Sequence, residues 1–243
     1  MNQSMETEGS EKILSVKLRI FIYNILSKIA KYTISRQRIV VIHYNDQYRR
    51  KIIDLINGIK MKTEMVLGIN EAYSIYMAVE KTKKILGEIA EVGVYKGGSA
   101  KLICEAKGEK PLHLFDTFEG IPKIGSIDSS SFYTGQYASS LEDVKDFLKN
   151  YDKVYFYKGM FPATSDPIKN KDFSFVHLDV DTYESTLNCL KFFYPRMMKG
   201  GIIISHDYIN SDGVRKAFDE FFEDKIEPVI ELSGSQCLIA KTA

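Results

Sequence analysis

From Leu86 onward, short apolar runs alternate with segments of helical periodicity, and this alternation limits the possible folds more than any other feature of the chain. A repeat of strand, helix and strand predicts a parallel sheet that is covered by helices on both faces. We therefore expect an α/β fold with a doubly wound, mostly parallel, Rossmann-like sheet. The expected strands lie in LGEIAEVGV, PLHLFDTF, KVYFYKG, FSFVHLDVD and GGIIISHDY.

The segments between these runs have the apolar spacing of helices. The C-terminal stretch EPVIELSGSQCLIAKT differs, because two apolar runs flank Ser233-Gly234-Ser235, a turn signal that is typical of hairpins. The sheet should therefore finish with an antiparallel pair. Helices are expected at residues 98–107, 140–151, 183–197 and 211–224.

The N-terminal part is mostly helical in its apolar spacing, so we predict a tail and helical extension at residues 1–62, followed by the α/β domain at residues 63–243. Within the extension, residues 13–35 are apolar but contain four basic side chains, which interrupt the roughly 18 consecutive apolar residues that a spanning helix needs. We expect this helix to pack on its own domain or on a second subunit of a homo-oligomer. A peripheral position on an anionic membrane surface is the alternative. The basic residues are Lys17, Arg19, Lys28 and Lys31.

Composition excludes several classes of protein. The 33 basic and 32 acidic side chains leave a formal charge of +1, so nothing in the overall charge suggests a nucleic-acid partner. The three cysteines, Cys104, Cys189 and Cys237, are odd in number and far apart, which argues against a disulfide framework or a zinc site. The polar N-terminus also lacks a secretory signal. We expect a cytoplasmic protein.

The sequence EVGVYKGGSA follows the first expected strand, where doubly wound folds bind phosphates or nucleosides. A dinucleotide fingerprint would read G-x-G-x-x-G, but Tyr95 stands where the middle glycine lets a pyrophosphate approach. This departure disfavours a nicotinamide cofactor and favours a ligand without a pyrophosphate, such as S-adenosylmethionine. Asp116 follows at the end of the second strand, near the offset of about 20 residues at which an acid meets ribose hydroxyls. Its alternative role is a helix or turn cap.

A third group of polar residues lies at the ends of the fourth and fifth expected strands. Asp179 and Asp181 follow one strand, and His206 and Asp207 follow the other. Because the carboxyl ends of adjacent parallel strands meet, these side chains should converge across the ligand cleft. Converging carboxylates are unfavourable unless a proton or cation compensates them. Oxygen ligands suit Mg²⁺, and a histidine also admits Mn²⁺.

These motifs, together with FDTFEGIP, KGMFPAT and GVRKAFDEFF, resemble the TylF/macrocin-type O-methyltransferases over residues 63–241. The resemblance implies a class I methyltransferase fold, S-adenosylmethionine as donor, and metal-assisted transfer to a hydroxyl, since the family includes enzymes that methylate sugar hydroxyls of antibiotics. It implies that Asp179 is both a metal ligand and the candidate base. Together with the residues after the fifth strand, our candidates are Asp179 and His206 for catalysis, and Asp179, His206 and Asp207 for metal binding. The donor residues that it implies are Thr63, Met65, Glu91, Gly93, Val94, Tyr95, Gly98, Ser99, Asp116, Thr117, Phe118 and Asp179.

One position departs from the family pattern, which commonly has Asp-Asp where this chain has His206-Asp207. Two hypotheses follow. In the first, Asp179, His206 and Asp207 bind a divalent metal that lowers the pKa of the substrate hydroxyl. In the second, His206 is the general base, because an unperturbed imidazole titrates near pH 6.5.

The long loop at residues 123–140 is a candidate cover for the cleft, and its aromatic side chains Phe132, Tyr133 and Tyr137 could stack on a sugar or ring. We expect the acceptor to be a sugar hydroxyl of a glycan or a glycosylated small molecule. A small phenol or catechol is the alternative acceptor. From other classes, Tyr95 argues against an NAD-type oxidoreductase, and the acidic cluster argues against a non-catalytic nucleoside-binding protein.

Overall fold

The computed structural model describes residues 18, 21, 22, 24–26, 28, 29, 47–128 and 131–242. The chain divides into two compact units, Met1–His43 and Tyr44–Ala243. In the first unit the described residues are helical and exposed. Most of the predicted helix at residues 13–35, including Lys17, Arg19 and Lys31, lies outside the described residues.

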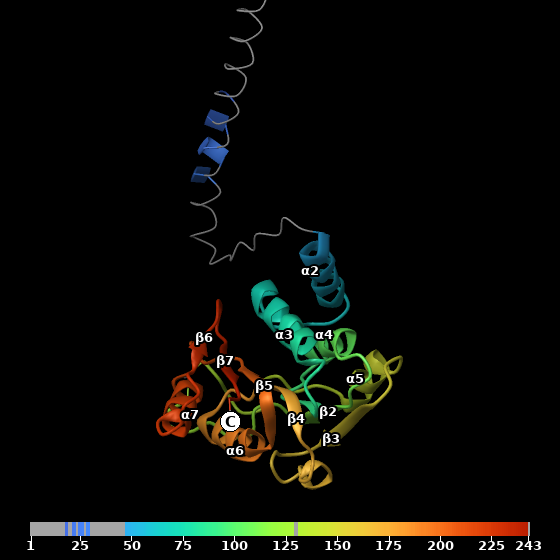
Figure 1. Cartoon of the computed structure of the whole chain (residues 1–243), viewed down its shortest axis with the longest axis vertical. Helices are drawn as coiled ribbons and strands as arrows, with labels where there is room; N and C mark the ends of the chain where they lie inside the picture. The colour runs from blue at the N-terminus through green and yellow to red at the C-terminus, as the bar shows by residue number, and fades with distance from the viewer. Residues whose placement is uncertain are drawn as a thin grey trace, which may run out of the picture. The chain divides into compact units, whose positions relative to one another are not determined.

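The second unit is built on a seven-stranded sheet in the order β3-β2-β1-β4-β5-β7-β6. Figure 1 labels these strands except β1. The first five strands of this order run parallel, whereas β7 is antiparallel to both β5 and β6. This arrangement confirms the predicted mostly parallel sheet with an antiparallel C-terminal pair. The strands are β1 (Glu88–Val92), β2 (Leu112–Asp116), β3 (Val154–Lys158), β4 (Phe173–Leu178), β5 (Met197–Ser205), β6 (Ile230–Glu231) and β7 (Cys237–Ala240).

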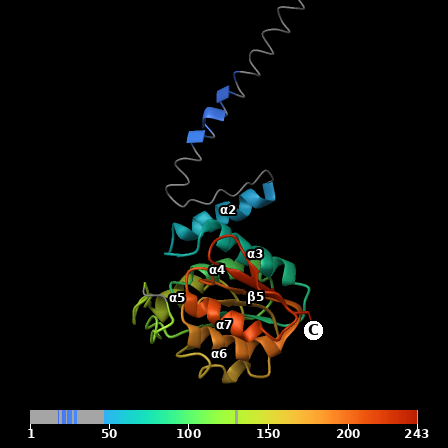
Figure 2. The same cartoon turned by 90° about the vertical axis from the view of Figure 1, so that its left-hand side faces the viewer.

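Helices cover both faces of the sheet. On one face α2 (Gln47–Lys60), α3 (Ile69–Thr82) and α4 (Gly98–Ala106) pack together, and on the other α6 (Tyr183–Phe193) packs against α7 (Asp212–Phe222), as Figures 1 and 2 show. The connection between β2 and β3 contains α5 (Leu141–Leu148). Because α2 buries Ile52, Ile53, Ile56 and Ile59, it packs as part of the second unit. The predicted domain boundary after residue 62 stays a prediction.

The sheet core explains why the strands have nearly continuous apolar sequences. Every residue of β4 is buried, and Phe173 and Phe175 are fully enclosed. Below the sheet, Phe161 stacks on Phe193 with ring centroids 5.1 Å apart. Each such ring stabilises the fold by about 1.5–3 kcal/mol through burial alone. A parallel strand covered on both faces requires this composition.

Element boundaries differ from the prediction where local chemistry intervenes. The helix expected at residues 183–197 ends at Phe193, and a 3₁₀ turn at Tyr194–Arg196 leads directly into β5. Pro195 causes this early end because it has no N–H to continue the helical hydrogen bonds. Strand β4 also stops at Leu178, one residue before Asp179. The acidic residues therefore lie on a loop just beyond the sheet.

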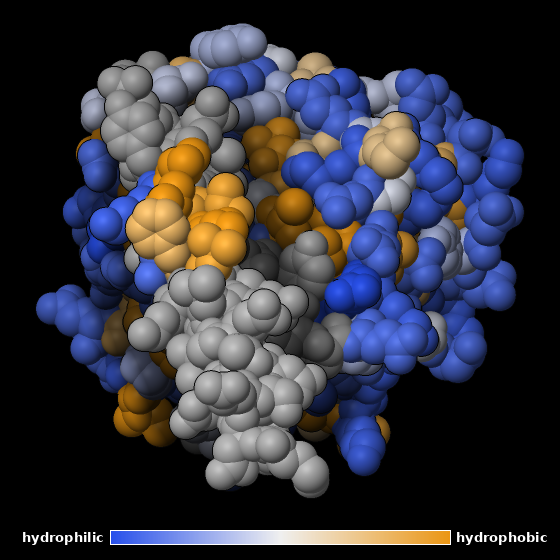
Figure 3. Space-filling model, turned by 90° about the horizontal axis from the view of Figure 1, so that it is seen from above, coloured by the Kyte–Doolittle hydropathy of each residue, from blue (hydrophilic) through white to orange (hydrophobic). Residues whose placement is uncertain are grey.

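No described helix is both long and apolar enough to cross a bilayer. The face of the molecule in Figure 3 carries mostly hydrophilic residues, with hydrophobic ones gathered in a few places. In the first unit, however, the described apolar side chains are exposed. They are Leu18, Phe21, Ile22, Ile25, Leu26 and Ile29.

Candidate active site

A pocket that is partly open to solvent lies at the carboxyl ends of β1, β2, β4 and β5. The sheet order reverses between β1 and β4, which is the usual position for a ligand in this architecture. The structure places most of the predicted site residues on the wall of this pocket. They are Met65, Gly93, Val94, Tyr95, Gly98, Ser99, Asp116, Thr117, Asp179, His206 and Asp207.

The glycine turn forms the floor of the pocket because its backbone lies against the loop after β4. Gly93 has φ 89°, and a Cβ built on it would lie 1.8 Å from the carbonyl oxygen of Asp179. Gly98 begins α4 under Met65, where an added Cβ would lie 2.7 Å from the Met65 Cβ. Glycine is therefore required at Gly93 by close packing and by its positive φ, and at Gly98 by close packing alone.

Asp116 holds this turn from the end of β2. Its Oδ2 accepts hydrogen bonds from the backbone N–H groups of Val94 (2.7 Å) and Tyr95 (2.8 Å), and its Oδ1 accepts from that of Phe118 (2.6 Å). These are the turn-capping contacts that the sequence left as an alternative. A carboxylate has about four acceptor positions, so one remains for a ribose hydroxyl. Asp116 can both shape the turn and bind a ligand.

Three of the residues predicted to bind the methyl donor do not line the pocket. Thr63 donates from Oγ1 to the carbonyl of Lys96 at 3.1 Å, and the ring of Phe118 is buried. Glu91 is fully buried, and its Oε1 lies 2.8 Å from His177 Nδ1 on the neighbouring strand. Burial raises the pKa of Glu91, and the contact with His177 opposes that effect. Contacts of these three residues with the methyl donor stay predictions.

The acidic residues and His206 converge as the sequence predicted. His206 Nδ1 lies 3.2 Å from Asp179 Oδ1 and 3.1 Å from Asp207 Oδ2. One ligand atom from each of these three residues lies within 4.8 Å of the others. Asp181, at φ 61°, also lines the pocket. The loop after β4 therefore aims two carboxylates at the residues that follow β5.

The electrostatics of this cluster are those of crowded carboxylates. Burial, followed by the charges of Asp179 and Asp207, raises the pKa of Asp181 well above its usual value. Burial alone would lower the pKa of His206, but Asp179 and Asp207 raise it well above its ordinary value. The His206 charge in turn holds the pKa of Asp179 below normal, although burial opposes this. These shifts favour a positively charged group among the carboxylates of the cluster.

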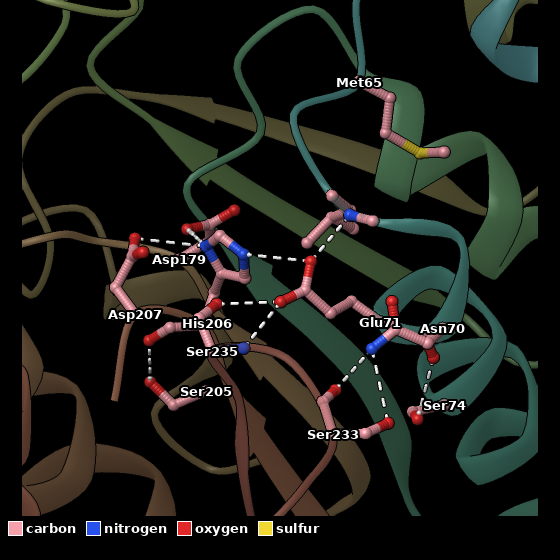
Figure 4. A network of polar contacts seen from close by, with 12 residues as sticks. Met65, Asn70, Glu71, Ser74, Asp179, Ser205, His206, Asp207, Ser233 and Ser235 are labelled. Carbon is pink, nitrogen blue, oxygen red and sulfur yellow. Dashed lines mark hydrogen bonds and ion pairs between the residues drawn. The ribbon is translucent and has the colours of Figure 1, made fainter. Parts of the chain in front are cut away.

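Glu71 is a residue of the site that sequence reasoning missed. It belongs to the first turn of α3, and Figure 4 shows its carboxylate between His206 and the turn before β7. Its Oε2 lies 3.6 Å from His206 Nε2, and its Oε1 accepts from the backbone N–H of Ser235 at 2.7 Å. Burial opposes ionisation, but contacts with His206, Ser235 and Gly68 lower the pKa of Glu71 to about 2. No motif marks Glu71 in the sequence, because the capping-box pattern requires Ser or Thr where this chain has Gly68.

The long loop contributes to the pocket through its described residues. Phe132 and Tyr137 line the pocket, whereas Tyr133 does not line it and is 64% exposed. Burial, followed by Asp181, Asp207 and Asp179, raises the pKa of Tyr137, and these residues line the same pocket. Two residues of the loop tie it to the site. Asp128 Oδ1 accepts from the N–H of Tyr183 at 2.7 Å, and Ser139 Oγ donates to the carbonyl of Tyr95 at 2.7 Å.

Curated relatives of this chain are O-methyltransferases. The demethyldecarbamoylnovobiocin O-methyltransferase of Streptomyces niveus is 26% identical over 201 residues, covering 74% of this chain and 75% of the relative. The 8-demethyl-8-(2,3-dimethoxy-alpha-L-rhamnosyl)-tetracenomycin-C 4'-O-methyltransferase of Streptomyces olivaceus is 30% identical over 176 residues, covering 65% of this chain and 67% of the relative.

Solved structures agree with the observed architecture. The O-methyltransferase NovP superposes with a TM-score of 0.65 and 27% identity, covering 74% of this chain and 83% of NovP. The calicheamicin methyltransferase CalS11 has a TM-score of 0.60 at 16% identity, covering 82% and 94%, and shows the fold alone. The sheet order is therefore that of class I methyltransferases.

The family model for macrocin-O-methyltransferase (TylF) matches residues 64–234. The matched region contains the glycine turn, Asp116, the acidic cluster and the loop that lines the pocket. The chain therefore belongs to the macrocin-O-methyltransferase (TylF) family and is an O-methyltransferase.

Proposed function

We propose that the protein transfers a methyl group from S-adenosylmethionine to a hydroxyl of a sugar, either on a glycosylated small molecule or on a glycan. One observation carries the proposal: a single pocket is lined by the glycine turn, by the acidic cluster, and by Phe132 and Tyr137. The glycine turn suits a nucleoside, and the acidic cluster suits an acceptor hydroxyl that must lose a proton. The names of relatives that act on a rhamnosyl or novobiocin compound support a glycosylated acceptor.

The chain's residues divide the work of methyl transfer between them. The turn at Gly93 and the carboxylate of Asp116 position the donor, and the loop aromatics position the acceptor ring. The transfer is an in-line displacement from a sulfonium, so this alignment supplies much of the acceleration. The carboxylates of Asp179 and Asp181 line the pocket and can hold the proton that the hydroxyl releases. A positioned base contributes about 10²- to 10⁴-fold.

We also propose that Asp179, His206 and Asp207 bind Mg²⁺ or Mn²⁺. Their atoms converge within 4.8 Å, and the carboxylates of Asp179, Asp181 and Asp207 line the same pocket. A bound divalent cation would lower the pKa of an acceptor hydroxyl. The alternative is His206 as general base; burial lowers the pKa of its imidazole, but Asp179 and Asp207 raise it well above its ordinary value when no cation is bound, which favours the protonated form.

The first test of this function is calorimetric titration with S-adenosylhomocysteine, with and without Mg²⁺. We expect micromolar binding, followed by transfer of labelled methyl to glycosides and not to catechol. Exhaustive chelation should then abolish turnover, and added Mg²⁺ or Mn²⁺ should restore it. Absence of S-adenosylhomocysteine binding in both buffers would refute the donor site. Turnover that survives chelation unchanged would refute the metal and favour His206 as base.

We further propose a cytoplasmic homo-oligomer in which the N-terminal helix contacts an anionic membrane surface. In its described residues, Leu18, Phe21, Ile22, Ile25 and Leu26 recur at three- and four-residue spacing, and all are exposed. Basic residues interrupt the same segment, which is the pattern of interfacial helices. The buried, unpaired cysteines suit a reducing compartment.

The membrane contact predicts a clear result in vesicle flotation. The full chain should float with phosphatidylserine vesicles at low salt and stay at the bottom with phosphatidylcholine vesicles, because the basic residues attract anionic lipid. Raising the salt concentration should weaken the interaction. Equal recovery with both lipids, or no flotation with either, would contradict the proposal. Light scattering on the same preparation measures the oligomeric state.

A further inference from the structure

We infer that Glu71 is a positioning residue for His206, and that its carboxylate fixes the imidazole so that Nδ1 is presented to a cation between Asp179 and Asp207. The inference rests on the proposed metal-assisted function and adds a residue to it. It also explains how this chain can use a histidine at a position where the family commonly has an aspartate. The geometry around the ring carries the argument.

The two ring nitrogens of His206 face different partners. Nδ1 lies 3.2 Å from Asp179 Oδ1 and 3.1 Å from Asp207 Oδ2, which are the other two members of the proposed metal site. Nε2 lies 3.6 Å from Oε2 of Glu71. The side chains of His206 and Glu71 are each only 10% exposed. Glu71 thus faces the ring from the side opposite the metal site, as Figure 4 shows.

Glu71 is held in place independently of His206. Its Oε1 accepts from the N–H (2.7 Å) and the Oγ (2.9 Å) of Ser235, and its Oε2 accepts from the N–H of Gly68 at 2.6 Å. Glycine also makes room for the carboxylate, because a Cβ at Gly234 would lie 2.4 Å from Oε1. The carboxylate is therefore fixed before any ligand arrives.

A fixed carboxylate on one side of an imidazole determines which nitrogen can bind a metal. A histidine ligand is neutral and carries one ring proton, which resides on the nitrogen that faces a hydrogen-bond acceptor. With a cation between Asp179 and Asp207, these carboxylates would no longer hold a proton on Nδ1. Glu71 would then favour the proton on Nε2 and leave the Nδ1 lone pair for the cation. At 3.6 Å the contact is longer than a hydrogen bond and acts through charge.

The competing explanation is purely structural. Glu71 is the N3 residue of α3 and caps that helix by accepting from Gly68, so its loss could simply loosen α3. The chain offers a matched control for this effect. Asn70 Nδ2 donates to the carbonyl of Ser233 at 2.6 Å, so it ties the same helix end to the same hairpin without an observed contact with His206.

The test measures Mn²⁺ affinity by the electron paramagnetic resonance signal of free Mn²⁺, using the full-length chain without substrates. Glu71→Gln should weaken Mn²⁺ binding about 10- to 100-fold, the range for loss of a partner that orients a ligand. Asn70→Ala should leave it within about threefold. In a His206→Asp background, Glu71→Gln should not weaken Mn²⁺ binding at all, because no imidazole remains to be oriented.

A structural role predicts equal losses in both backgrounds, and that result would overturn the inference. Wild-type affinity in Glu71→Gln would also overturn it. If the wild-type chain binds no Mn²⁺, both the inference and the metal fail, while S-adenosylhomocysteine binding by the same sample tests the methyltransferase function separately. Should Glu71→Gln not fold, Ser235→Ala removes one donor to Glu71 and should weaken Mn²⁺ binding only when His206 is present.

Discussion

Asp179→Asn is expected to lower kcat by about a thousandfold while changing the Kd for S-adenosylhomocysteine less than about threefold. Asp179 lies where the two halves of the site meet, because it follows β4, contacts His206 and lines the pocket. The substitution keeps the size of the side chain and removes its charge. It therefore removes one proposed metal ligand and one proton acceptor without opening a cavity.

Two further measurements separate this effect from a loss of folding. The melting temperature of Asp179→Asn should stay within a few degrees of wild type, since removing one of several crowded carboxylates also relieves repulsion. Asp224→Asn is the matched control, because Asp224 is an exposed carboxylate that pairs with Lys225 in a different part of the chain. It should retain full activity. Turnover by Asp179→Asn within tenfold of wild type would refute the role of Asp179 in catalysis.

Much of the fold could be predicted because each element follows a local rule. Continuous apolar runs such as FSFVHL require strands that are buried on both faces, and Ser233-Gly234-Ser235 requires a tight reversal. The ends of helices and strands were less predictable where a single residue interrupts the regular apolar spacing. Pro195 ends α6 before the apolar spacing ends, and the sequence pattern alone continues through it.

The candidate site could be predicted where topology brings residues together, and could not where side chains meet across the fold. Parallel strands align their carboxyl ends, so the approach of Asp179 to His206 follows from the strand order alone. No such rule links Glu71 in α3 with Ser235 before β7, because their contact depends on how α3 packs over the sheet. Glu91 likewise has a buried partner, His177, that the spacing of residues in the sequence did not indicate.

The second large effect is expected at Gly93. We expect Gly93→Ala to destabilise the protein by about 3–5 kcal/mol and to abolish binding of the methyl donor. The new Cβ would lie 1.8 Å from the carbonyl oxygen and 2.7 Å from the carbonyl carbon of Asp179, and φ 89° is itself strained for alanine. Both obstacles are backbone, so no rotamer change relieves them. At about 2–4 °C per kcal/mol for a domain of this size, the melting temperature should fall by roughly 10 °C.

Substitutions at two other glycines serve as controls that separate backbone strain from steric contact. Gly135 has φ 85° with nothing within 4 Å of an added Cβ, so Gly135→Ala carries the conformational strain alone and should cost about 1 kcal/mol. Gly58 lies inside α2 with open space around it, and Gly58→Ala should stabilise by about 0.5–1 kcal/mol. If Gly93→Ala and Gly135→Ala have the same melting temperature, and Gly93→Ala still binds S-adenosylhomocysteine, the loop after β4 can move away from the added Cβ. The close approach of Gly93 to Asp179 would then not be what couples the donor turn to the acidic cluster.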